Sequence, residues 1–237
     1  MFRNGNQRKR RTILLSVLVV ALVGAIVGVG VYFYFSDKET SEGNKITAGT
    51  LDLQYQITGY DVNDPDDNSA AVTLSSGEVQ NGGNAYVTFT DIAPSDTGTI
   101  EWTVKNIGSL HGYLTVTATQ ESGTGDTPEP EEVAITENDD TDKNLDEYLK
   151  ITLTQKIGEA EPVTLANGVL LKNLQTTLSS SEDAKDQKLE KAGAENSKDT
   201  CVYTLSWELP EETGNIVQGD TSTLTLKFQL NQTTEQP

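Results

Sequence analysis

The sequence predicts an all-β fold, a jelly-roll β-sandwich of about seven to eight antiparallel strands, preceded by an N-terminal hydrophobic signal or anchor helix. Seven segments alternate apolar and polar residues with a period of two, which is typical of strands that bury one face. Turn-forming residues separate these segments, and no helical period is sustained. The chain has 237 residues, enough for one sandwich-sized domain behind the apolar segment.

The N-terminal part has the layout of an export signal. Basic residues between Arg8 and Arg11 precede an uncharged apolar run from Thr12 to Phe35. This run is also long enough to cross a bilayer, which takes about 20 apolar residues in a helix. Gly28 and Gly30 have the spacing that an export signal peptidase requires, so we expect cleavage near residue 30 or 31. The alternative is that residues 1–31 remain as a membrane anchor, and in both cases the basic end stays inside.

The expected domain covers residues 48–237. Its first strand, 50–58, places Leu51, Leu53, Tyr55 and Ile57 on one face. Six further segments alternate in the same way and are rich in Thr, Val, Ile and aromatic residues. The seven expected strands are 50–58, 85–92, 99–104, 114–119, 149–154, 201–209 and 223–230.

Two segments interrupt this pattern and are expected to be loop insertions. The segment near 121–146 is acidic and contains proline, which is typical of a solvated loop. The second insertion lies near 173–199; most of it, 179–199, is polar and rich in Ala, Lys and Glu and has no apolar stripe. At most a short exposed helix is expected there.

The charge is divided sharply along the chain. All 36 acidic residues lie after the apolar run, whereas every arginine lies before it. The exported part is therefore strongly acidic and is expected to repel nucleic acid and anionic lipid. Contact with a membrane is expected only through the N-terminal segment before cleavage. The same charge opposes self-association unless salt or bound cations screen it.

Few residues suggest chemistry. Cys201 is the only cysteine and lies in an expected strand, so it is expected to be a small buried apolar residue. His111 is the only histidine, which rules out the His-Glu-x-x-His pattern of zinc peptidases, and an exposed turn is expected for it. No catalytic residue and no cofactor is predicted. Asn231 begins an Asn-Gln-Thr acceptor pattern for glycosylation.

One acidic loop is a weak candidate for calcium, which prefers oxygen ligands. Its candidate ligands are Asp61, Asn63, Asp64, Asp66 and Asp67. The loop departs from the EF-hand pattern because Asp66 stands where that pattern requires glycine. Simple solvation of the acidic side chains is the alternative.

Four blocks of sequence, in order behind the apolar run, carry a family resemblance. The first comprises residues 35–41 and 48–53, the second 91–96 and 104–109, the third 144–149, and the fourth 207–210, 214–215 and 218–220. These blocks resemble the TasA/camelysin family of exported fibre proteins. In the second block the family usually has Pro-Gly-Asp, whereas this chain has Ser95 in place of the glycine. The segments 121–146 and 173–199 show no resemblance.

The resemblance implies a secreted jelly-roll subunit that polymerises with identical subunits into extracellular fibres or bundling pili of a biofilm matrix, at the surface of a bacterial or archaeal cell. The N-terminal segment of one subunit would complete the sheet of its neighbour. Residues 32–47 are the expected arm, with Tyr32, Phe33, Tyr34, Phe35 and Ile46 as candidate anchors. The aromatic residues could instead form the interfacial belt of a membrane helix.

Two other functions remain as alternatives. Members of the same family are labelled metallopeptidases, so a camelysin-like surface peptidase is one. A monomeric, membrane-anchored surface or adhesion domain is the other.

Overall fold

The computed structural model describes residues 49–65, 70–75, 80–81, 83–123, 144–214, 216–217 and 219–233. All of them belong to one compact unit, Gly49–Pro237. The expected signal or anchor, 1–31, and the expected arm, 32–47, lie outside the described residues and stay predictions. Within the described ranges, no helix combines the length and apolar character needed to cross a membrane.

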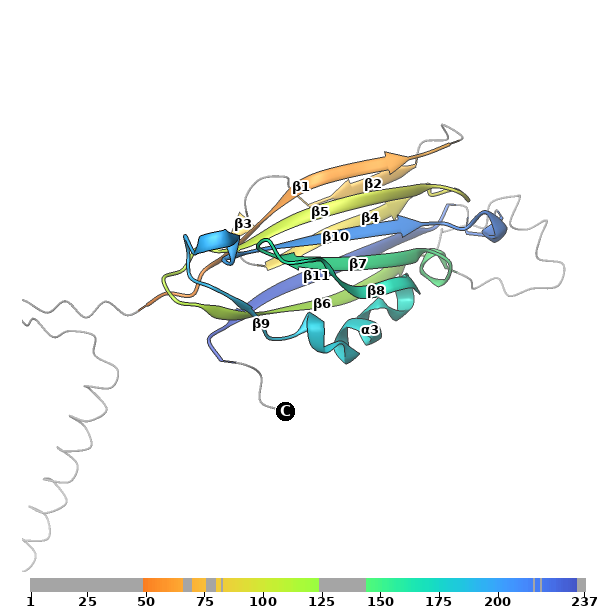
Figure 1. The fold of residues 1–237 in the computed structure, drawn as a ribbon. Helices are drawn as coiled ribbons and strands as arrows, with labels where there is room; N and C mark the ends of the chain where they lie inside the picture. The colour runs from red at the N-terminus through yellow and green to blue at the C-terminus, as the bar shows by residue number, and fades with distance from the viewer. Residues whose placement is uncertain are drawn as a thin grey trace, which may run out of the picture. The chain divides into compact units, whose positions relative to one another are not determined.

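Two antiparallel sheets form the domain (Figure 1). Sheet A has six strands in the order β3-β1-β5-β10-β7-β8, and sheet B has five in the order β2-β4-β11-β6-β9. The strands are β1 Leu53–Asn63, β2 Ala71–Leu74, β3 Gln80–Asn81, β4 Gly83–Thr90, β5 Thr97–Asn106, β6 Gly112–Gly123, β7 Lys150–Ile157, β8 Val163–Leu170, β9 Gln187–Leu189, β10 Thr200–Glu208 and β11 Thr221–Asn231.

The core lies between the two sheets and follows from the alternation in the sequence. On β10, the side chains of Cys201, Tyr203, Leu205 and Trp207 all face inward and are buried. The Trp207 ring meets the Phe89 ring of β4 edge to face, with centroids 5.6 Å apart. Such aromatic pairs add to the gain from burial alone. The prediction that Cys201 is a buried apolar residue is confirmed.

The strand order interleaves late strands with early ones. In sheet A, β10 lies between β5 and β7, and in sheet B, β11 lies between β4 and β6. The last two strands therefore complete the centre of both sheets, as in the predicted jelly-roll class of sandwich. That fold class is confirmed, and all seven expected strands are present. Four more strands, β2, β3, β8 and β9, bring the described total to eleven.

One side of the sandwich is closed by the segment that follows β8. It contains η2 (Leu171–Asn173), α3 (Leu174–Ser180), η3 (Glu182–Ala184) and β9. It is more tightly packed than its composition predicts, because its few apolar residues all turn inward. The buried residues are Leu171, Leu174, Leu178, Ala184 and Leu189. Leu174 and Leu178 are one helical turn apart, and α3 packs against both β6 and β8.

Candidate functional site

The edges of the two sheets differ in how they are covered. On one side of the sandwich, α3 packs against β8 at the edge of sheet A and against β6 of sheet B. On the opposite side, β1 and β2 run along the two sheets, with α3 far from both (Figure 1). We call this second side the open side. An uncovered sheet edge presents backbone N–H and C=O groups to which another strand can add.

The outer edge of β1 is only partly paired. Toward sheet A, β1 pairs with β5 from Leu53 to Asn63. On its other edge, β1 pairs with β3 through Gln54 and Tyr55 alone. Within the described ranges, the outer edge of 57–63 thus has no strand partner.

Five half-buried apolar side chains line the open side. A register shift between Ile57 and Gly59 lets β1 present Ile57, Tyr60 and Val62 to the interior, because Tyr60 lies opposite the buried Ile100. On β2, Val72 and Leu74 lie opposite the buried Phe89 and Val87, and so also face inward. We call these residues the β1–β2 strip; its members are Ile57, Tyr60, Val62, Val72 and Leu74.

Two tyrosines of β1 reach across the open side to the backbone of sheet B. The Tyr55 hydroxyl donates to the Asn84 carbonyl at 2.7 Å, and Tyr55 is 4% exposed. The Tyr60 hydroxyl donates to the Val72 carbonyl at 3.3 Å, and Tyr60 is 49% exposed. Burial raises the pKa of both phenols above the ordinary value. The Tyr55 hydrogen bond, near the start of β1, is therefore short and buried. The Tyr60 hydrogen bond, farther along β1, is long and belongs to a half-exposed side chain.

The start of β1 is tied to the loop between β5 and β6. The Thr50 N–H donates to Ser109 Oγ at 2.9 Å, and the Leu110 N–H donates to the Thr50 carbonyl at 3.1 Å. The backbones lie so close that a Cβ added to Gly108 would stand 2.3 Å from the Thr50 oxygen. Residues 49–52 thus lie on the β5 side of β1, away from its outer edge.

The sequence blocks that carry the family resemblance meet in pairs. Residues 49–52 of the first block contact 107–109 of the second, as just described. Asn106, also in the second block, is buried and bonds to Gly108, Leu110 and Glu190. In the third block the Leu145 N–H donates to Asp220 of the fourth at 3.0 Å. These sequence blocks therefore hold loops of the domain together through hydrogen bonds.

The described calcium candidates lie at the end of β1 and directly after it. Asp61 and Asn63 are exposed, the Asp64 carboxylate accepts the Ala70 N–H at 3.1 Å, and Asp66 and Asp67 lie outside the described residues. Calcium binding by this loop stays a prediction.

Two single predicted residues lie near the start of β6 and the end of β11. Asn231 ends β11 and accepts a hydrogen bond from Gln229 at 3.0 Å, and its glycosylation also stays a prediction. His111 is exposed just before β6, as expected.

Sequence reasoning missed the strip itself. β2 is four residues long, and its alternation of Val72 and Leu74 with Ala71 and Thr73 is too brief to predict a strand. Gly59, directly after the expected first strand, 50–58, was the available signal for the irregularity that redirects Tyr60.

Taken together, these features define an antiparallel jelly-roll sandwich, closed on one side and open on the other. A family model described as "Camelysin metallo-endopeptidase" matches residues 9–67 of the chain. The match confirms the resemblance to the TasA/camelysin family and covers the apolar run, the arm and β1. A search of curated protein sequences found no match.

The family description names a metallo-endopeptidase, and the residues offer little for that chemistry. The matched segment, 9–67, contains neither histidine nor cysteine, and the chain has a single histidine. In the described ranges, no three His, Cys, Asp or Glu side chains gather closely enough to hold a metal ion.

Proposed function

We propose that this protein is a structural subunit of an extracellular fibre or bundling pilus, exported and assembled head to tail with identical subunits. In this proposal, the arm of one subunit, 32–47, adds to the sheet of the next. The observation that carries the proposal is the open side, where a half-buried apolar strip adjoins a stretch of sheet edge that has no strand partner among the described residues. The family match supports it because it covers the expected arm.

Both the arm and the sheet edge would gain from the contact. An added strand satisfies edge N–H and C=O groups while its side chains cover the exposed apolar surface. Full burial of one aromatic side chain is worth about 1.5–3 kcal/mol, and Tyr32 to Phe35 offer four in succession. Because the arm and the edge are different surfaces, the contact is heterologous and repeats into an open filament.

Export and cell-surface location belong to the same proposal. The basic and apolar N-terminal segment would direct the chain to a signal peptidase, and cleavage near residue 30 or 31 would release the arm. Lateral bundling of filaments is part of the proposal as well.

The test compares two purified chains, one beginning at Tyr32 and one beginning at Ala48. We expect filaments in electron micrographs of the longer chain and monomers for the shorter one, with equal melting temperatures for the two domains. Filaments of equal length from both chains would contradict the proposal. A longer chain that stays monomeric would favour the surface or adhesion domain.

A peptidase is the second candidate, favoured by the description of the matching family. Purified protein incubated with casein, with and without a chelator, separates the two. Cleavage that the chelator abolishes would support the peptidase, and intact casein would support the structural role.

A further inference from the structure

We propose that the β1–β2 strip is the acceptor for residues 32–47 of a second copy, and that the Tyr60 hydroxyl covers this acceptor until the arm arrives. This inference rests on the proposed function and names the site that the function requires.

The two sides of the sandwich are not equivalent as acceptors. On the closed side, Leu171, Leu174 and Leu178 are at most 1% exposed and fill the space between the sheets. An arm could bind there only after α3 had left. On the open side, the strip residues are all partly exposed, and among the described parts of the domain only the Tyr60 side chain has to move.

The backbone of β2 offers hydrogen-bonding groups to an incoming strand. In antiparallel pairs, residues that exchange hydrogen bonds alternate with residues that do not. The Ser75 N–H donates to the Tyr86 carbonyl at 2.9 Å, which places Ser75 and Thr73 in bonded positions opposite β4. The backbone groups of Val72 and Leu74 therefore point away from β4, toward the open side.

The arm that fits comes from a second copy. The chain's own arm would have to fold back at the start of β1, and β3 already occupies the outer edge there at Gln54 and Tyr55. In addition, residues 49–52 are bonded to the loop at 107–110, on the other side of β1. The start of the outer edge is thus closed to an intramolecular hairpin, while the stretch from Ile57 onward stays accessible to a neighbour.

Tyr60 is placed to act as a cover. Its ring faces the interior from β1, and its hydroxyl bonds to the outward-pointing carbonyl of Val72 at 3.3 Å. An arm that pairs with β2 needs that same carbonyl. The Tyr60 bond is near the limit of hydrogen-bond length, and the residue is 49% exposed, so an N–H of the arm can replace it easily.

The first experiment blocks the acceptor and leaves the arm unchanged. Val72→Lys, in the chain beginning at Tyr32, places a charge in the strip and leaves the arm intact. Thr73→Lys is the matched control, because Thr73 lies on the same strand and faces outward. We expect the Val72→Lys chain to form no filaments and the Thr73→Lys chain to form filaments like the unmodified chain, with thermal unfolding showing that both are folded. Tyr60→Lys gives a second blocked variant whose half-exposed position tolerates the charge.

A mixture then tests the pairing directly. The chain beginning at Ala48 has an acceptor and no arm, whereas the Val72→Lys chain has an arm and no acceptor. We expect the two to form a one-to-one complex in light scattering after gel filtration. If the arm is needed for filaments but this complex does not form, the acceptor lies elsewhere and only this inference fails. If the chain beginning at Ala48 still makes filaments, the proposed function itself fails.

The cover is tested by Tyr60→Phe, with Tyr86→Phe as control. Tyr86 is similarly exposed, at 47%, but lies on the outer face of sheet B. We expect Tyr60→Phe to shorten the lag before filament growth at least twofold, and Tyr86→Phe to leave it unchanged. An unchanged lag in Tyr60→Phe would show that the hydroxyl does not act as a cover.

Discussion

At the scale of single residues, the fold depends on a few positions where the backbone or a buried group has unusual requirements. Ser95, in the turn between β4 and β5, has a φ of +77°, a conformation that favours glycine. This is the position where the related family usually has glycine, so the conformation explains the family preference. The serine is held there because its N–H donates to the Leu209 carbonyl at 2.8 Å.

Ser95→Gly should stabilise the domain. The left-handed conformation costs a residue with a side chain about 1–2 kcal/mol. The greater conformational freedom of glycine in the unfolded chain offsets about 0.5–1 kcal/mol of this stabilisation. We therefore expect a net gain of about 0.5–1 kcal/mol in urea unfolding. Ser206→Gly, in the middle of β10, is the control and should lose stability; a loss in both variants would contradict this account.

The buried thiol predicts a loss of stability at alkaline pH. Burial raises the pKa of Cys201 from 9.0 to about 12. Between pH 9 and 12 the unfolded chain releases this proton and the folded chain keeps it. Stability is therefore full below pH 9 and falls above it, by up to about 1.4 kcal/mol per pH unit from this group.

Urea unfolding at pH 7, 9 and 10 measures this fall. Burial also raises the pKa of Tyr203, which adds to the loss only above its ordinary value of 10.0. Cys201→Ala should be less stable than the unmodified protein at neutral pH and should decline less between pH 9 and 10. Equal slopes in the two proteins would show that the thiol is not responsible.

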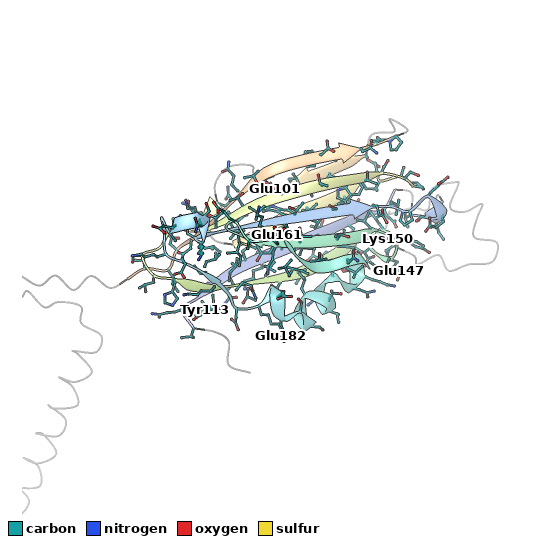
Figure 2. All side chains as sticks on the ribbon, in the orientation of Figure 1. Glu101, Tyr113, Glu147, Lys150, Glu161 and Glu182 are labelled. Carbon is teal, nitrogen blue, oxygen red and sulfur yellow. The ribbon has the colours of Figure 1, made fainter. Side chains whose placement is uncertain are left out.

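At the scale of elements, the two sides of the sandwich are built from different kinds of sequence. The closed side depends on apolar residues dispersed in a polar segment. The open side depends on β1, which pairs with β3 only near its start. Charged side chains lie on the outer surfaces, such as the half-buried Glu101 on β5 and the exposed Glu182 just after α3 (Figure 2).

Leu178→Ala tests how far α3 contributes to the core. Leu178 is 1% exposed, and truncation of such a leucine costs about 2–5 kcal/mol through lost burial and a new cavity. The exposed Gln175, on the same helix, is the control, and Gln175→Ala should change the unfolding free energy by less than about 0.5 kcal/mol. A small effect at Leu178 would mean that α3 detaches without disturbing the sandwich.

The sequence predicts the long strands well and the edges poorly. β4, β5, β6, β7, β10 and β11 bury one face each, so their alternation is regular and their positions could be read directly. β8 contains Asn167 and Gly168, which indicate a turn, yet Gly168 takes a φ of +57° at an irregularity within the strand. The strip joins β1 to β2 across the sandwich, and no local pattern shows which edges face each other.

At the scale of the whole molecule, the proposed assembly would have to overcome repulsion between acidic subunits. The chain has 36 acidic residues, all in the part that would be exported. Several of its lysines are already engaged, such as Lys172 with Glu147 at 3.1 Å and Lys150 with Glu208 at 3.6 Å. Glu147 and Lys150 lie near each other at one end of the domain (Figure 2).

Filament growth should therefore accelerate with salt. Screening shortens the range of repulsion from about 30 Å at 0.01 M to about 10 Å at 0.1 M ionic strength. We expect light scattering of the chain beginning at Tyr32 to rise faster at the higher salt concentration, while the chain beginning at Ala48 gives no signal at either. Slower growth at higher salt would mean that attraction between opposite charges drives assembly.

The long register between β1 and β5 has a mechanical consequence. A force applied to the chain at Gly49 would pull β1 along its own length, parallel to the stretch from Leu53 to Asn63 that is paired with β5. The hydrogen bonds of an antiparallel pair stand perpendicular to the strands, so such a load shears them together instead of peeling them one at a time. In the proposed filament, β1 would therefore resist such a pull along its whole paired length.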